Sequence, residues 1–213
     1  MFENLQGFFE STLGQVVTIG IIAVFFLFIL IPNQNQKSKR ADTKAVTISA
    51  LMVALATGLG MMKLFEMPYG GTVTVFSMLP IVLCGYLLGT RRGVMAGICV
   101  GLLNLIFGPY VIHPVQLLVD YPFAFGALGL SGLCANQKNG LVKGYIVGLV
   151  GRYACAVISG IVFFGAYAPE GFNAVTWSFF YNFTYLAAEG ALTLVIISLP
   201  SVKKALEGLK NQL

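Results

Sequence analysis

Charged side chains are scarce in this sequence of 213 residues: only 10% of them are Asp, Glu, Lys or Arg, whereas 57% are hydrophobic. A soluble domain carries about 25% charged residues, which it needs to cover a surface that faces water. The scarcity therefore excludes a soluble globular protein. It indicates an integral membrane protein, whose length is best counted in bilayer crossings of about 20 apolar residues each.

Histidine and the common catalytic motifs are also nearly absent. The sequence has one histidine, His113, and four cysteines without CxxC spacing, a pattern that argues against a zinc site or a disulfide framework. It contains no GxxxxGKS/T phosphate loop, no HExxH and no GxSxG. The chain therefore cannot drive transport by hydrolysing ATP itself, and we expect neither enzymatic activity nor a cofactor.

Long apolar stretches are what the sequence does have. They predict seven membrane-spanning helices, over residues 13–31, 45–62, 72–89, 93–107, 115–134, 141–165 and 174–199. Strands of a membrane barrel would alternate apolar and polar residues, and these stretches do not, so the fold class is an all-α integral membrane protein. A polar linker follows the first stretch. We therefore expect an extra N-terminal transmembrane helix with its linker (1–43) and a six-helix membrane domain (44–213).

The basic residues give the orientation of the chain. Eleven of the thirteen fall in alternate loops or at the C-terminus: Lys37, Lys39, Arg40, Lys44, Arg91, Arg92, Lys138, Lys143, Lys203, Lys204 and Lys210. Because cytoplasmic loops are enriched in Lys and Arg, this pattern predicts a multi-pass protein of the cell membrane with its N-terminus outside and its C-terminus in the cytoplasm. The net charge of +5 is then a topology signal, which removes nucleic acid as a partner.

Three ionisable residues lie inside predicted spans: Asp120, Arg152 and Glu189. Each costs about 3 kcal/mol or more to insert, so each needs a structural or functional reason. Arg152 is as consistent with packing or snorkelling as with function. Glu189, near the middle of the last helix, favours a structural hydrogen bond between helices, with a role at the ligand site as the alternative.

Aromatic residues gather in the loops predicted to face outside and just below them. Trp177 and Tyr181 are four residues apart and share a helical face, with Asn182 and Tyr185 beside them. For any single tyrosine, the aromatic belt of the membrane interface is the simpler interpretation. Together with Asp120 at the same depth, however, these residues favour a pocket for a flat ligand with a positively charged ring.

Ordered sequence blocks between about residues 44 and 200 resemble a known family. They are MPYGGTVT at 67–74 leading to SMLPI at 77–81, HPVQLLVDY at 113–121, ISGIVFFGAYAPEG at 158–171 and YNFTY at 181–185. This pattern is similar to that of thiamine-specific S components of energy-coupling factor (ECF) transporters. The resemblance implies a six-helix subunit that captures thiamine at the outer face. It also implies release of the vitamin inside, together with a transmembrane coupling subunit and two cytoplasmic ATPases.

The resemblance also implies a set of site residues. The ligand positions of the family correspond to Tyr69, Gly71, Tyr110, Asp120, Tyr121, Phe164, Trp177 and Asn182, with Tyr69 and Gly71 on the loop that closes the pocket; Tyr181, Tyr185 and Glu189 are possible additions. Ala50 and Ala54 match the small-residue motif that meets the coupling subunit, and such a pair lets helices approach closely. The sequence departs from the family at Ala156, where relatives usually carry a histidine that contacts the vitamin, and at Gly71, where some carry a large aromatic residue.

Other functions remain open at this level. The pocket could belong to an S component for a related vitamin or pyrimidine analogue. Alternatively, Asp120, Arg152 and Glu189 could form the relay of a stand-alone ion-coupled carrier, with the aromatic residues merely at the interface. A membrane enzyme acting on a lipid is a further class, although no motif supports it.

Overall fold

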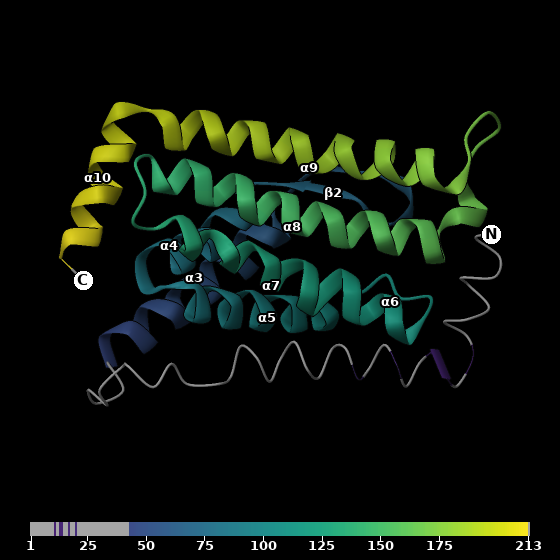
Figure 1. Ribbon diagram of the computed structural model, residues 1–213, viewed down its shortest axis with the longest axis horizontal. Coiled ribbons are helices and arrows are strands. Elements are labelled where there is room, and N and C mark those ends of the chain that lie inside the picture. The colour runs from purple at the N-terminus through teal and green to yellow at the C-terminus, as the bar shows by residue number, and fades with distance from the viewer. Residues whose placement is uncertain (1–10, 12, 15–16, 18–19, 21–42, 213) are drawn as a thin grey trace.

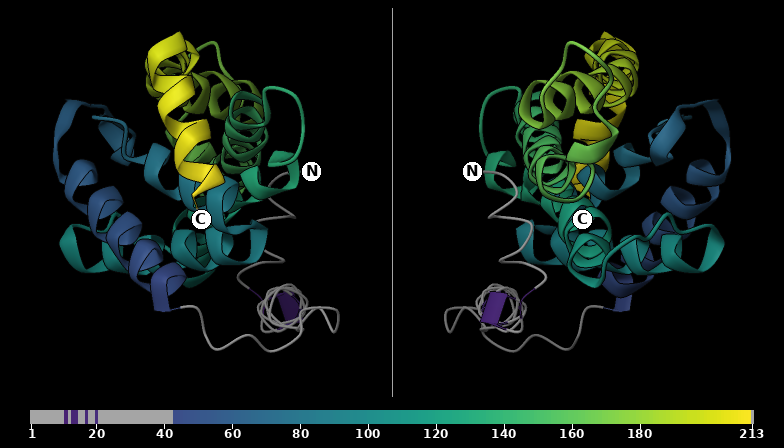
Figure 2. Two further views of the ribbon diagram at one scale, coloured as in Figure 1. Left: turned by 90° about the vertical axis from the view of Figure 1, so that its left-hand side faces the viewer. Right: turned by 90° about the vertical axis from the view of Figure 1, so that its right-hand side faces the viewer.

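Figure 1 shows a computed structural model of the chain, which describes residues 11, 13, 14, 17, 20 and 43–212. Apart from those isolated positions, the predicted N-terminal helix 13–31 and its linker lie outside the described residues. From residue 43 onward the chain forms an elongated helical bundle with its long helices side by side (Figures 1 and 2).

The first half of the bundle contains a small β-hairpin between helices. Helix α3 spans Thr43–Met61, and the hairpin follows as β1 (Lys63–Glu66), the 3₁₀ turn η1 (Pro68–Gly70) and β2 (Thr72–Thr74), with antiparallel strands; then come α4 (Met78–Leu88) and α5 (Thr90–Phe107). Met78 and Ile81 of α4 are fully buried and belong to the core of the bundle. Helix α4 thus belongs to the core of the bundle and packs against α3 and α5.

The second half of the bundle begins with a helix built from several segments. These are α6 (Pro114–Leu118), the π-helical turn η2 (Val119–Phe123), α7 (Ala124–Leu128) and the 3₁₀ segment η3 (Gly129–Cys134). Two long helices follow, α8 (Gly140–Phe163) and α9 (Ala174–Ser198), with the short η4 (Gly165–Tyr167) between them and α10 (Pro200–Asn211) at the end.

Five of these segments are long and apolar enough to cross a membrane: α3, α5, the composite Pro114–Cys134, α8 and α9. Helix α4 is also apolar but has only 11 residues. Large apolar side chains point outward on these helices, among them Ile106 (73% exposed) and Val195 (66%), as expected where lipid replaces water. The all-α membrane architecture is therefore confirmed, and five of the predicted spans agree with the structure to within a few residues.

The predicted span 72–89 was wrong over its first six residues. Residues 72–74 form a strand, and the helix begins only at Met78. Thr72, Val73 and Thr74 are all β-branched, which favours an extended backbone, and Phe76 then adopts a left-handed conformation with φ 57° that ends the strand. The apolar composition concealed this change of conformation.

The π-helical turn packs tightly against α5. Pro122 lies inside the turn and has no backbone N–H to donate, which suits a position where the regular hydrogen-bond ladder is interrupted. Glycine on α5 allows the close approach: a Cβ at Gly101 would lie 2.5 Å from the carbonyl oxygen of Tyr121, and one at Gly97 would collide with that of Phe125. The segment carrying Asp120 and Tyr121 is thereby fixed against α5.

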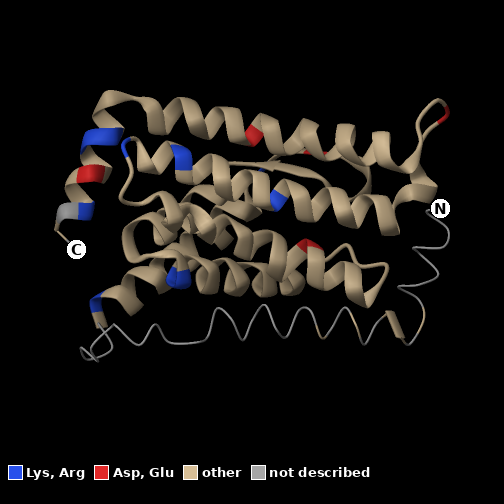
Figure 3. Ribbon diagram, viewed as in Figure 1, with Lys and Arg blue, Asp and Glu red and all other residues tan. Residues whose placement is uncertain are grey.

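Basic residues gather at one end of the bundle, the end that α10 crosses (Figure 3). Helix α10 is fixed there through its lysines: Lys203 Nζ donates to Asn139 Oδ1 at 2.6 Å, and Lys210 Nζ donates to the carbonyl of Ala135 and lies 4.7 Å from the ring centroid of Tyr86. This basic end is opposite the loops that follow α5 and α8.

Candidate functional site

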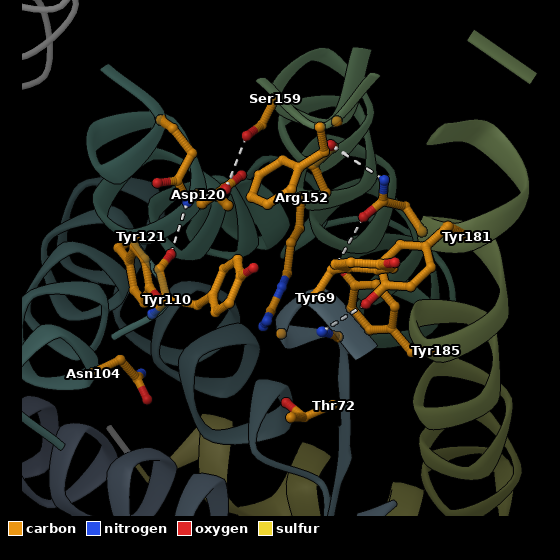
Figure 4. A pocket seen from close by; sticks show the side chains of 18 of the residues that line it. Tyr69, Thr72, Asn104, Tyr110, Asp120, Tyr121, Arg152, Ser159, Tyr181 and Tyr185 are labelled. Atoms are coloured by element: carbon orange, nitrogen blue, oxygen red, sulfur yellow. Dashed lines mark hydrogen bonds between the residues drawn. The ribbon is translucent and has the colours of Figure 1, made fainter. Parts of the chain in front are cut away.

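A cavity of about 360 Å³, whose lining side chains are drawn in Figure 4, reaches the loops that follow α5 and α8. The hairpin β1–β2 covers one side of it, and α8, α9, the π-helical turn η2 and the loop after α5 contribute most of the other lining residues; α3, α5, α6, α7 and η4 add one or two each. The cavity thus lies where segments distant in sequence converge, as is usual for ligand sites.

Aromatic rings form much of the cavity wall. The rings of Tyr110 and Phe164 stack with centroids 5.9 Å apart and an interplanar angle of 27°. On α9, the ring centroids of Trp177 and Tyr181 are 5.6 Å apart, and those of Tyr181 and Tyr185 are 5.9 Å apart. Faces of this kind attract flat rings and cations.

Asp120 brings a carboxylate to this wall from the π-helical turn. Its Oδ2 accepts hydrogen bonds from Gln116 Nε2 at 2.6 Å and from Ser159 Oγ at 2.8 Å (Figure 4). Within residues 43–212, no protein group donates to its Oδ1 in the structure. One oxygen therefore orients the carboxylate, and the other is free to accept a hydrogen bond from a ligand.

Gln116 links the carboxylate to the outer loop. Its side chain is 1% exposed; Nε2 also donates to the carbonyl of Tyr110 at 3.1 Å, while Oε1 accepts from the backbone of Ile112 at 3.2 Å. Tyr110 is fixed a second time, because its backbone N–H donates to Tyr121 Oη at 2.7 Å. These hydrogen bonds thus hold the loop after α5 next to Asp120.

The hairpin is fixed over the cavity by Tyr181. The Oη atom of Tyr181 donates to the carbonyl of Pro68 and accepts a hydrogen bond from the backbone N–H of Gly71 at 2.9 Å. A Cβ at Gly71 would lie 2.6 Å from this Oη, which explains why a glycine stands at this position in the present chain.

Asn182 uses its amide within the protein. Its Nδ2 donates to the carbonyls of Ser178 (2.9 Å) and Ala156 (3.3 Å), and its Oδ1 accepts from Tyr185 Oη at 2.9 Å. The side chain is only 6% exposed. Asn182 therefore lines the cavity while fixing α9 against α8.

Arg152 enters the cavity from α8 (Figure 4). Its Cζ lies 4.1 Å from the ring centroid of Phe125, and its Nη1 is buried without a hydrogen-bond partner among the described residues. It also borders a side compartment of about 40 Å³, which Glu189 lines from the other side. Four charged residues therefore line the cavity: Lys63 and Glu66, which form an ion pair with each other, and Asp120 and Arg152.

The eight residues that the sequence predicts as ligand positions all line this cavity: Tyr69, Gly71, Tyr110, Asp120, Tyr121, Phe164, Trp177 and Asn182. Tyr181 and Tyr185 line it too, as does Ala156, whereas Glu189 lines only the side compartment. Ala50 and Ala54 are exposed on α3, away from the cavity. Sequence reasoning did not assign Arg152, Gln116 and Ser159 to the site; for Arg152, its charge within an apolar stretch was the available signal.

Comparisons with known proteins agree on one family. Residues 46–207 match the model of the family described as "Thiamine transporter protein (Thia_YuaJ)". Thiamine transporter ThiT of Bacillus subtilis is 32% identical over 182 residues, covering 78% of this chain and 92% of that protein. Thiamine transporter ThiT of Lacticaseibacillus paracasei is 30% identical over 139 residues, covering 57% of this chain and 69% of that protein.

The fold has a solved counterpart. A structure of ThiT from Listeria monocytogenes superimposes with a TM-score of 0.62 at 24% identity, covering 76% of this chain and 98% of the other. At this identity the likeness concerns the fold.

Proposed function

This chain belongs to the thiamine transporter family (Thia_YuaJ), the thiamine S components of ECF transporters, and we propose that it captures thiamine in the cavity beneath the β1–β2 hairpin. The protein is thus a transporter and not an enzyme. The observation that carries the proposal is that Asp120 Oδ1 accepts no hydrogen bond from residues 43–212 and lies in a cavity lined by aromatic rings.

Thiamine suits this site chemically, because it consists of a positively charged thiazolium ring joined to a flat aminopyrimidine. The aromatic faces of Tyr110, Phe164 and Trp177 offer stacking and cation–π contacts to such rings. Asp120 offers a negative charge for the cation and an acceptor for an N–H group. Arg152 supplies a hydrogen-bond donor in the same cavity, and its positive charge offsets the negative charge of Asp120.

The binding unit corresponds to residues 44–213 in our proposal. The family match spans residues 46–207, and the cavity is lined only by residues from Gly60 onward within the described part of the chain. We assign no ligand contact to residues 1–43.

We further propose that the basic end of the bundle faces the cytoplasm and that the cavity opens outward in the cell membrane. The enrichment of Lys and Arg at the α10 end supports this orientation. Two cytoplasmic ATPases would then supply the energy. A transmembrane coupling subunit would transmit it by contacting the exposed Ala50 and Ala54 of α3.

The test is thiamine binding to the purified protein without ATP. Trp177 is the only tryptophan of the chain and lines the cavity, so bound thiamine should quench its fluorescence in a saturable manner. The variant Asp120→Asn should weaken binding by about tenfold or more, because it loses a charged hydrogen-bond acceptor.

The matched control is Glu170→Gln, which neutralises an exposed carboxylate in the loop before α9 and should leave affinity unchanged. Absence of saturable quenching at micromolar thiamine, in protein verified as folded, would count against both the ligand and the site.

A further inference from the structure

Glu189 is a buried carboxylate that the ligand site does not use. It lies near the middle of α9 and is 4% exposed. Its Oε2 accepts hydrogen bonds from the backbone N–H of Thr74 at 3.0 Å and from Thr74 Oγ1 at 2.7 Å. Its Oε1 accepts from Ser77 Oγ at 3.2 Å and from the backbone N–H of Met78 at 3.3 Å. All four donors belong to residues 74–78, the short stretch that runs from the last residue of β2 to the first residue of α4.

This stretch is the point where the hairpin joins the core of the bundle. The connecting turn contains Phe76 in the left-handed region (φ 57°), a conformation that a bulky side chain adopts only when its surroundings impose it. Glu189 bonds to Thr74 before this turn and to Ser77 and Met78 after it. It therefore fixes both sides of the turn.

Helix α4 depends on Glu189 for its first turn. The N-terminal backbone N–H groups of a helix lack partners within the helix, and a negative charge there is favourable. Ser77, the residue at the N-cap, makes no capping hydrogen bond to its own helix, and Glu189 instead accepts from Met78. Helix α9 thus supplies the cap that α4 lacks.

The same face of α9 holds the other end of the hairpin. Tyr181, two turns before Glu189, contacts Pro68 and Gly71 at the tip, where the hairpin covers the cavity. We propose that Glu189 is a positioning residue: by fixing the base of the hairpin, it holds Tyr69 and Gly71 over the cavity and sets the rate at which bound thiamine leaves. This inference rests on the proposed function for its ligand.

The variant Glu189→Gln tests this role with little change in volume. An amide nitrogen donates hydrogen bonds and cannot accept them, so at least one donor of the stretch would face another donor. We expect thiamine dissociation, followed by stopped-flow fluorescence of Trp177, to accelerate about tenfold or more. The association rate constant should change less than threefold, because the open site is unaltered.

A second measurement separates positioning from a general loss of stability. Hydrogen–deuterium exchange of the ligand-free protein should accelerate in residues 63–78 of Glu189→Gln and stay unchanged in α5 and α8. The matched control is Glu207→Gln, which neutralises an exposed carboxylate on α10 and should alter neither measurement.

The outcomes are distinguishable. Unchanged dissociation and unchanged exchange in folded Glu189→Gln would overturn the inference about Glu189. If the unmodified protein fails to bind thiamine, the proposed function is wrong, and the exchange experiment still decides whether Glu189 fixes the hairpin. If Glu189→Gln does not fold, the variant Thr74→Val replaces it, because valine has a similar shape but lacks the hydroxyl that donates to Glu189. This variant should accelerate hydrogen–deuterium exchange in residues 63–78. No acceleration there would also overturn the inference.

Discussion

The two oxygens of Asp120 have different roles at the scale of single residues. Gln116 and Ser159 both donate to Oδ2, which orients the carboxylate, whereas no group within residues 43–212 donates to Oδ1. A carboxylate oriented in advance loses little conformational freedom when a ligand binds. The neighbouring aromatic rings are fixed in a similar way, through Tyr110 and Tyr121.

Ala156 offers the most direct residue-level prediction. It lines the cavity where related S components are expected to carry a histidine that contacts the vitamin. The variant Ala156→His should tighten thiamine binding by about fivefold or more, because an imidazole adds a hydrogen-bonding group worth about 1 kcal/mol and a further ring face. Isothermal titration calorimetry provides the measurement.

Ala154→His is the control for this variant, because Ala154 lies on the same helix and is exposed outside the cavity. It should bind thiamine like the unmodified protein. Weaker binding by Ala156→His would mean that the cavity has closed around the smaller side chain.

Sequence spacing could predict some of the site residues and not others. The four-residue interval between Trp177 and Tyr181 places both on one face of α9, and a regular helix guarantees that relation. The site role of Gln116 depends on how the outer loop folds back over it. The charge of Arg152 within an apolar stretch marks it as unusual. Its position over the ring of Phe125 and in the cavity wall depends on the tertiary structure, which the sequence pattern does not give.

At the scale of elements, the contact between α5 and the π-helical turn η2 decides where the site residues lie. Long apolar stretches predicted the helices well, because bilayer thickness fixes their length. They could not predict the π turn, the 3₁₀ segment η3 or the hairpin, since these depend on how neighbouring segments pair their backbone hydrogen-bonding groups. Gly101 is one point of such close packing, because a Cβ there would lie 2.5 Å from the carbonyl oxygen of Tyr121.

Gly101→Ala should therefore destabilise the protein by about 1–3 kcal/mol, as overpacking of a tight contact does. The added methyl group would displace the Tyr121 backbone, so thiamine affinity should fall as well. Thermal unfolding in detergent and calorimetry measure the two effects.

Gly58→Ala on α3 is the matched control, because a Cβ there meets no atom within 4 Å. It should be neutral or slightly stabilising, since alanine favours a helix more than glycine does. Equal effects of the two variants would refute the role of the α5 contact.

At the scale of the whole molecule, the bundle separates an end that contains the cavity from a basic end. The cavity and the hairpin occupy one end, and α10 with its lysines crosses the other. The sequence predicted this polarity from the alternation of basic loops, because loop charge is a local property that needs no tertiary structure. The sequence did not predict which contacts connect the two ends of the bundle.

The chain on its own should bind thiamine but not accumulate it. It has no phosphate-binding motif, and its fold offers a capture site. In proteoliposomes, uptake of labelled thiamine should require the coupling subunit, both ATPases and ATP together. Uptake by the chain alone, driven by an imposed proton gradient, would establish the stand-alone carrier instead.

The shortness of α4 affects how far the vitamin must still travel. At 1.5 Å per residue, its 11 residues rise about 16 Å, roughly half the hydrocarbon thickness of about 30 Å. The β1–β2 hairpin comes shortly before the first residue of α4, and its two strands pair their backbone groups with one another, as the low-dielectric interior demands. In the proposed orientation, thiamine bound beneath the hairpin would therefore already lie part of the way into the hydrocarbon layer before the proposed ATPases act.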